Sequence, residues 1–251
     1  MYMIQSWLEE MEYEHQIDIL FAVETGSRAW GGATSHSDYD IRFIFKRSQV
    51  RTYLSMEKAL ETLDFPAPYD AMGWDLFKAF HLLEKSNGSL LEWAVSPIVY
   101  RDQHDFSKKL RLYIEESYSL FSLYQHYIHL MARNVKEVHH KSYNEKRQKK
   151  LIQAVRSFLL AKEIVLNRQI PCDVLYSTFS KATNEDTIRS FYLLLMDSKQ
   201  KGCLVSETLV DAMISTMVNE RESFEKFTNE LPRGLQNVQV LNEWIWELLE
   251  V

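Results

Sequence analysis

The sequence is poor in the residues that build disulfide frameworks, turn-rich β structure and membrane spans. Its two cysteines are too few for a disulfide scaffold or a zinc cluster. Seven glycines and five prolines among 251 residues favour helices over an architecture with many tight turns. No apolar run approaches the ~20 residues of a membrane span, and the N-terminal segment carries acids but no basic leader. We therefore expect a cytoplasmic protein with no membrane partner.

The balance of charge excludes broad attraction to nucleic acid but permits a local contact. The net charge is −6, with 25% charged and 46% hydrophobic residues, so the surface as a whole does not attract a polyanion. A local basic groove is compatible with this total. The length is sufficient for one large or two modest hydrophobic cores.

Apolar patterns divide the chain into two parts. Residues 17–24 and 39–46 predict buried strands, and residues 69–75 predict a third, shorter strand. Beyond residue 105, long helical patterns follow one another to the end of the chain. We therefore expect an α+β fold, in which a small mixed β-sheet occupies a domain of residues 1–105 and an all-helical domain occupies residues 106–251.

Two aspartates separated by one residue stand at the start of the second predicted strand. Because side chains alternate along a strand, Asp38, Asp40 and Arg42 share one face, and Tyr39 and Ile41 share the other. Neighbouring carboxylates repel each other, and a divalent cation removes that cost. Mg²⁺ binds carboxylate oxygens and substrate phosphates together, and such ions activate an attacking hydroxyl and neutralise a departing pyrophosphate. The pair therefore predicts a site for Mg²⁺ or Mn²⁺.

A Gly-Ser step ends the first predicted strand, and ten residues separate it from Asp38. Gly26 has no Cβ atom, so a phosphate can approach its backbone closely, and the Ser27 hydroxyl can donate a hydrogen bond. The N–H groups of Ser27, Arg28 and Ala29 would open a short helix and face an anion. The Gly-Ser step and the aspartate pair together predict a phosphate cradle facing a metal site, an arrangement that favours phosphoryl transfer.

This ordered combination resembles the signature of the nucleotidyltransferases of the DNA polymerase beta superfamily. Residues 70–100 also resemble the subgroup of RNA-repair-pathway nucleotidyltransferases, and the likeness is clear over residues 20–100 and weaker in the helical half. The resemblance implies transfer of a nucleoside monophosphate from a nucleoside triphosphate to an acceptor hydroxyl, with release of pyrophosphate. The residues leave the acceptor open between an RNA end, a protein side chain and a small molecule, and only the resemblance favours RNA.

The resemblance further implies a third carboxylate on a strand after the aspartate pair. Asp70 lies on the predicted strand and would point at the metal ions, so we expect Asp70 to act with Asp38 and Asp40. Asp75 is the alternative, although it is also a natural N-cap for the helix that follows.

Basic side chains are candidates for binding nucleotide phosphates. Arg28 and Arg42 could hold a triphosphate, although a salt bridge from Arg42 to Asp40 is an equally ordinary explanation. A lysine at the position of Lys78 is implied by the resemblance. The densest basic run, residues 146–156, would ordinarily be a solvated helix face, yet it could contact nucleotide phosphates or an RNA backbone. The expected nucleotide-binding residues are Gly26, Ser27, Arg28, Arg42, Lys78, Lys149 and Lys150.

Two other functions remain open at this level. Arg133 and His139 resemble the Arg-spacer-His motif of HEPN-type ribonucleases, which need no metal, although such pairs occur by chance on many helices. A non-catalytic protein that binds nucleotide is the third possibility, and the presence of both Asp38 and Asp40 disfavours it. Glu24 is either an acid near the site or only a charge at a strand end. The oligomeric state stays open.

Overall fold

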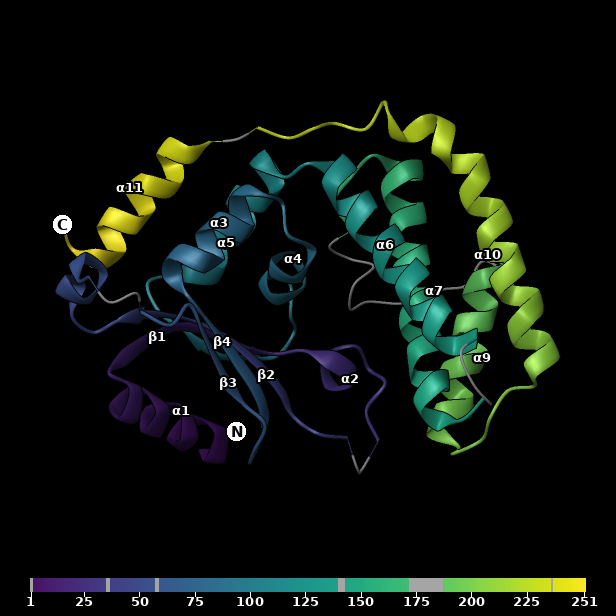
Figure 1. Ribbon diagram of the computed structural model, residues 1–251, viewed down its shortest axis with the longest axis horizontal. Helices are drawn as coiled ribbons and strands as arrows, with labels where there is room; N and C mark the ends of the chain where they lie inside the picture. Colours follow the sequence, from purple (N-terminus) through teal and green to yellow (C-terminus); the bar gives the residue numbers. More distant parts are fainter. Residues whose placement is uncertain (1, 35–36, 57–58, 140–142, 172–186, 236) are drawn as a thin grey trace. The chain divides into compact units, whose positions relative to one another are not determined.

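The computed structural model describes residues 2–34, 37–56, 59–139, 143–171, 187–235 and 237–251, and Figure 1 shows the arrangement of its elements. A five-stranded mixed sheet in the N-terminal part is followed by a mostly helical region. The expected α+β class is therefore confirmed. None of the helices among the described residues combines the length and the apolar composition that a membrane crossing requires.

The sheet has the strand order β3-β4-β2-β1-β5. Strand β2 runs parallel to β4, and the other neighbouring pairs are antiparallel, which makes the sheet mixed. The strands β1, β2 and β4 match the three predicted ones, whereas the four-residue edge strands β3 and β5 carried no pattern from which to predict them. The bounds are Ile17–Glu24 for β1, Asp40–Arg47 for β2, Thr62–Phe65 for β3, Asp70–Asp75 for β4 and Val99–Asp102 for β5.

Each face of the sheet is covered by helices. Ile41, Phe43 and Phe45 of β2 join one buried cluster with Trp7 and Leu8, which belong to helix α1 (Tyr2–His15). Their alternate neighbours, Asp40 and Arg42 among them, point to the opposite face. On that face lie α3 (Leu76–Glu84), α5 (Phe106–Ser117) and, packed on α3, α11 (Val238–Leu249). The remaining short helices are α2 (Gly26–Ala29), the 3-10 helix η1 (Val50–Leu54) and α4 (Gly88–Ala94).

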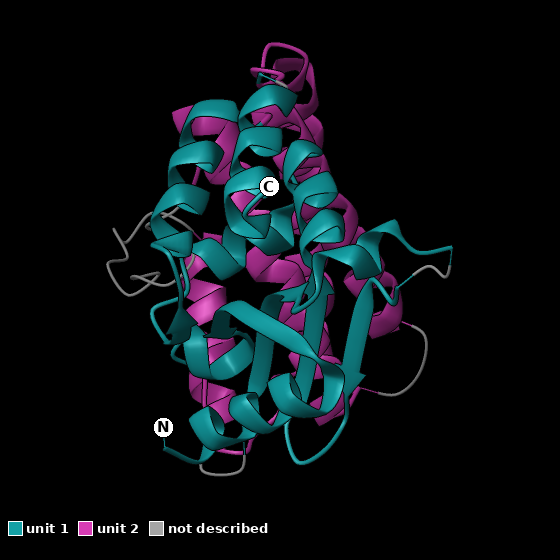
Figure 2. Ribbon diagram, turned by 90° about the vertical axis from the view of Figure 1, so that its left-hand side faces the viewer, with its two compact units in different colours: residues 1–31, 35–118, 235–251 teal, residues 32–34, 119–234 magenta. Residues whose placement is uncertain are grey.

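The chain forms two compact units, which Figure 2 colours separately. Residues 1–31, 35–118 and 235–251 make the first unit, and residues 32–34 and 119–234 make the second. This division differs from the boundary expected after residue 105, because α5 and α11 both belong to the unit that contains the sheet. Aromatic packing accounts for the difference.

Two aromatic residues tie α5 and α11 to the sheet. The Phe106 ring stacks on Phe21 of β1 with centroids 5.8 Å apart. Trp244 of α11 lies against Phe80 and Phe106, at centroid distances of 4.7 and 4.8 Å. An amphipathic pattern predicts that a helix buries one face, but it does not tell which unit supplies the partner.

The second unit is helical. It contains α6 (Leu120–His139), α7 (Glu145–Asn167), α9 (Thr187–Gln200) and α10 (Glu207–Thr228), which share a buried cluster that includes Phe158 and Phe191. The first of the helical patterns expected beyond residue 105 is divided between α5 and α6, since Tyr118 is extended and α6 begins anew at Leu120. The Ser122 N–H donates to Ser119 Oγ at 3.0 Å, so Ser119 acts as the N-cap of α6.

Candidate active site

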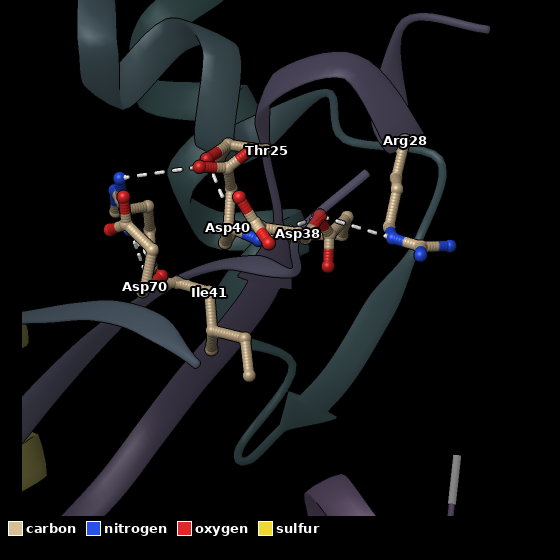
Figure 3. A network of polar contacts seen from close by, with 8 residues as sticks. Thr25, Arg28, Asp38, Asp40, Ile41 and Asp70 are labelled. Carbon is tan, nitrogen blue, oxygen red and sulfur yellow. Dashed lines mark hydrogen bonds and ion pairs between the residues drawn. The ribbon is translucent and has the colours of Figure 1, made fainter. Parts of the chain in front are cut away.

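Asp40 and Asp70 begin two adjacent parallel strands and lie directly opposite each other in the register of β2 and β4. Asp38 stands two residues before Asp40 on the same chain segment. Figure 3 shows Asp40 between Asp38 and Asp70 at this end of the sheet. The three aspartates that the sequence proposed as metal ligands therefore lie at one end of the sheet, although their carboxylates do not form a ready metal cluster.

The antiparallel pairing of β1 with β2 brings the Gly-Ser step to the same place. The Thr25 N–H donates to the Asp40 carbonyl at 2.8 Å, and the Thr25 hydroxyl donates to it at 3.1 Å. Gly26 has a φ of +64°, and a Cβ atom there would lie 2.7 Å from Asp40 Cγ and collide with Oδ2. Glycine is therefore needed for two reasons, the left-handed backbone and the close approach of Asp40. The group that approaches Gly26 is a carboxylate of the protein, whereas the sequence led us to expect a phosphate there.

Arg42 lies between two of the carboxylates. Its Nη1 atom is 3.0 Å from Asp70 Oδ1 and donates at 2.8 Å to the Asp70 carbonyl. Its Nη2 atom is 3.9 Å from Asp40 Oδ1. The salt bridge from Arg42 to Asp40 that the sequence left open is thus present. It is the longer of the two ion pairs that Arg42 makes. Arg42 supplies the local positive charge.

Burial raises the pKa of Asp40 to about 6. The nearby Arg42 guanidinium lowers it, while the negative charges of Asp70, Glu24 and Asp38 raise it further, in that order of size. A half-buried carboxylate among three others is a place where a cation is favoured. The mutual repulsion expected from the sequence therefore acts on Asp40.

The donor chemistry of this site fits Mg²⁺ or Mn²⁺. Carboxylate oxygens are hard ligands of the kind that these ions prefer, and Asp40 has three other carboxylates near enough to act on its pKa. Among the described residues, no group of three aspartate, glutamate, histidine or cysteine side chains is arranged so that it could hold a metal ion. Asp70 instead faces Arg42, with more than half of its side chain exposed.

Glu24 is the neighbour of this site whose position the sequence left open. Its side chain is fully buried, and its Oε1 atom accepts the Asp40 N–H at 2.9 Å. The Tyr100 hydroxyl donates to Oε2 at 2.5 Å, and burial, followed by Glu24 itself, raises the pKa of Tyr100. Sequence reasoning missed Tyr100 altogether. An acid that directly follows the apolar run of residues 19–23 was the signal that could have identified Glu24.

Arg28 is hydrogen-bonded to the backbone of the segment that leads to the aspartate pair. Its Nε atom donates to the Asp38 carbonyl at 3.1 Å, and Nη2 donates to the Ser37 carbonyl at 2.6 Å. The guanidinium also lies 4.0 Å from the centre of the Tyr39 ring. These contacts fix the backbone before Asp40. The remaining N–H groups of the Arg28 guanidinium could bind a phosphate.

The structure places Asp75 and Lys78 away from Asp40. Asp75 pairs with Phe45 in the β2–β4 register, five residues or ~16 Å along the strand from Asp40. Its carboxylate caps α3 by accepting the Phe77 N–H at 3.0 Å. Lys78 donates to Thr62 Oγ1 at 2.5 Å at that same far end. The capping role anticipated for Asp75 is confirmed, and neither residue joins the three carboxylates.

The remaining candidates lie in the helical unit. Lys149 is exposed, and Lys150 Nζ is 3.3 Å from Glu137 Oε2, so the basic run is partly neutralised by an acid of α6. Arg133 and His139 are both exposed, and their six-residue spacing on α6 sets them about 120° apart around the helix. The chain does not bring these two side chains together on one helix face.

Two comparisons with known proteins show what the whole chain resembles. The model of the family described as "RNA repair pathway DNA polymerase beta family" matches residues 2–247, nearly the whole chain. An uncharacterized protein of Bacillus subtilis (strain 168), YcgL, is 30% identical over 227 residues, which cover 89% of this chain and 86% of that protein. The likeness extends across both units and is not confined to the aspartate motif.

Proposed function

Because the chain belongs to the RNA repair pathway DNA polymerase beta family, we propose that it is a Mg²⁺-dependent nucleotidyltransferase. It moves a nucleoside monophosphate from a nucleoside triphosphate to an acceptor hydroxyl and releases pyrophosphate. The observation that carries this proposal is the register of β2 and β4, which sets Asp40 opposite Asp70 beside the Gly26 backbone.

The side chains of the site have separate roles in the proposed reaction. Asp38, Asp40 and Asp70 would hold the metal, which when bound activates the attacking hydroxyl and neutralises charge on the phosphates. Arg42, which is paired with Asp70, would bind the triphosphate. The Ser27 hydroxyl binds a phosphate oxygen beside the Gly26 backbone.

Arg28 serves this mechanism by position. Its two bonds to backbone carbonyls hold residues 37–38 in place, which restricts where the Asp38 carboxylate can lie. Preorganised ligands of this kind lower the cost of reaching the reactive geometry.

We further propose that the acceptor is an RNA end. The family description supports this choice, as does the basic run that contains Lys149 and Lys150 in an otherwise acidic chain. Replacement of both lysines by alanine should then weaken RNA binding and flatten its dependence on salt. Lys226→Ala, an exposed lysine on α10 outside the run, is the matched control.

A labelling experiment tests the proposed reaction. The protein is incubated with each α-labelled nucleoside triphosphate, Mg²⁺ or Mn²⁺, and total RNA or a cell extract. We expect label to enter an acceptor with the parent chain, and to be absent with EDTA or with Asp40→Asn. Binding of triphosphate without release of pyrophosphate would instead indicate a non-catalytic nucleotide-binding protein. Cleavage of RNA in EDTA would instead indicate a ribonuclease that uses Arg133 and His139, which no contact among the described residues favours.

A further inference from the structure

Glu24, the last residue of β1, has a fully buried carboxylate that is bonded on both oxygens. One oxygen accepts the Asp40 N–H at 2.9 Å, and the other accepts the Tyr100 hydroxyl at 2.5 Å. The Glu24 carbonyl in turn accepts the Ser96 hydroxyl at 2.6 Å. Two separate segments, the start of β2 and residues 96–100, therefore hold this one residue in place.

None of the ion pairs between described residues includes Glu24. Buried carboxylates are normally paired with a cationic side chain or lie beside a metal ion, since an uncompensated buried charge is costly. The carboxylate of Asp40, whose own N–H Glu24 binds, faces the proposed metal site. A cation bound there would add to the compensation that Arg42 gives Asp40 at 3.9 Å and would lie near Glu24 as well.

We propose that Glu24 is a positioning residue for the metal ion that Asp40 binds. It acts in two ways. Its bond to the Asp40 N–H fixes the main chain from which the Asp40 carboxylate is aimed past Gly26, and its buried charge makes the site more attractive to a divalent cation. Glu24 itself reaches neither metal nor substrate. The inference rests on the proposed function, because it assumes that Asp40 is a metal ligand.

The β1–β5 pairing explains why Tyr100 takes part. Strand β5 lies antiparallel to β1 at the edge of the sheet, and this carries the buried Tyr100 side chain to Glu24 across 76 positions of sequence. Because the Tyr100 hydroxyl donates to Oε2 of Glu24, Oε1 is available to accept the Asp40 N–H. Groups that orient a metal ligand in this way commonly change metal affinity by ~10- to 100-fold when they are removed.

Glu12 provides a matched control within the same unit. Its carboxylate also accepts a strand N–H, that of Ile19, at 2.8 Å, but it is paired with Arg101. Ile19 lies opposite Phe45, at the end of β2 away from Asp40. Replacement of Glu12 by glutamine thus removes an equivalent charge and leaves the proposed site untouched.

The test measures binding of Mn²⁺ alone, from the electron paramagnetic resonance signal of the free ion. Glu24→Gln keeps an oxygen for the Asp40 N–H and removes the charge. We expect it to bind Mn²⁺ about tenfold more weakly than the parent or worse, whereas Glu12→Gln binds as the parent does. Circular dichroism and urea unfolding report whether each variant is folded. A folded Glu24→Gln variant with the parent's affinity would overturn the inference.

Tyr100→Phe keeps the inference testable if Glu24→Gln fails to fold. It preserves the Glu24 charge and removes one bond, so we expect a roughly three- to tenfold loss of Mn²⁺ affinity, the size of one hydrogen bond. No loss would again overturn the proposal. Asp40→Asn separates this result from the proposed function. If Asp40→Asn binds Mn²⁺ as the parent does, the metal site is wrong. If it binds weakly while the Glu24 and Tyr100 variants bind normally, only the role of Glu24 is wrong.

Discussion

The carboxylate of Asp40 occupies the space that a side chain on Gly26 would need. Gly26, the first residue of α2, and Asp40, the first residue of β2, are therefore one structural unit. Any residue larger than glycine must push the carboxylate away, because the Asp40 main chain is held by Thr25 and Glu24.

Gly26→Ala should therefore abolish Mn²⁺ and triphosphate binding together. The new Cβ collides with Asp40, and strain in the left-handed backbone lowers the free energy of unfolding by about 1–2 kcal/mol. Gly31→Ala is the control, since Gly31 has a φ of +72° but nothing within 4 Å of its Cβ position. Equal loss of ligand binding in the two variants would show that backbone strain, and not displacement of Asp40, is the cause. Calorimetry with Mn²⁺ and a triphosphate, beside urea unfolding, supplies both readouts.

Asp40→Asn should affect activity and metal-free stability in opposite directions. An amide is a poor ligand for a hard cation, so we expect nucleotidyl transfer to fall by ~10³-fold or more, equivalent to roughly 4 kcal/mol of transition-state stabilisation. The same change removes repulsion from Asp38, Asp70 and Glu24, so the free energy of unfolding stays the same or rises. A variant that unfolds more easily in EDTA yet keeps its transfer rate would make Asp40 a structural carboxylate.

The raised pKa of Asp40 predicts how metal-free stability depends on pH. In the folded protein the pKa is about 6, against 3.8 for the unpaired group, so between these values the folded state holds the proton more often than the unfolded state. The free energy of unfolding should therefore fall as pH rises from 4 to 6, by on the order of 1 kcal/mol once solvent screening is allowed for. Urea unfolding in EDTA across this range should show the fall in the parent, and a shallower one in Asp40→Asn.

The sequence identified the segments with strong local patterns. Residues 17–24 form a run that reads as a strand in isolation, and β1 occupies that range. The spacing from Gly26 to Asp38 can likewise be read directly from the sequence. Edge strands β3 and β5 are four residues long, too short for alternation to separate them from loops.

The contacts that complete the site depend on register, which the sequence does not display. Gly26 meets Asp40 because Glu24 pairs with Ile41, and a shift of one residue would turn the carboxylate to the other face. Tyr100 reaches Glu24 only through the pairing of β5 with β1. The choice between Asp70 and Asp75 also needed the β2–β4 register, since both lie within the same strand.

Asp70 and Asp75 should respond differently to replacement by alanine. Asp70 is mostly exposed and faces Asp40 and Arg42, so Asp70→Ala should lower nucleotidyl transfer strongly and leave the free energy of unfolding nearly unchanged. Asp75 is buried, caps α3 and accepts the Tyr53 hydroxyl at 2.9 Å. Its loss should lower the free energy of unfolding by about 1–2 kcal/mol.

The transfer rate per folded molecule decides between the two aspartates. Asp75→Ala should keep that rate, since the residue lies at the far end of β4 from Asp40, whereas Asp70→Ala should not. Urea unfolding gives the folded fraction, and release of pyrophosphate gives the rate. The reverse pattern, with a stable but inactive Asp75 variant and an active Asp70 variant, would move the third carboxylate to the other end of the strand. It would also mean that the parallel register of β2 and β4 does not define the site, because Asp75 lies opposite Phe45 and not Asp40.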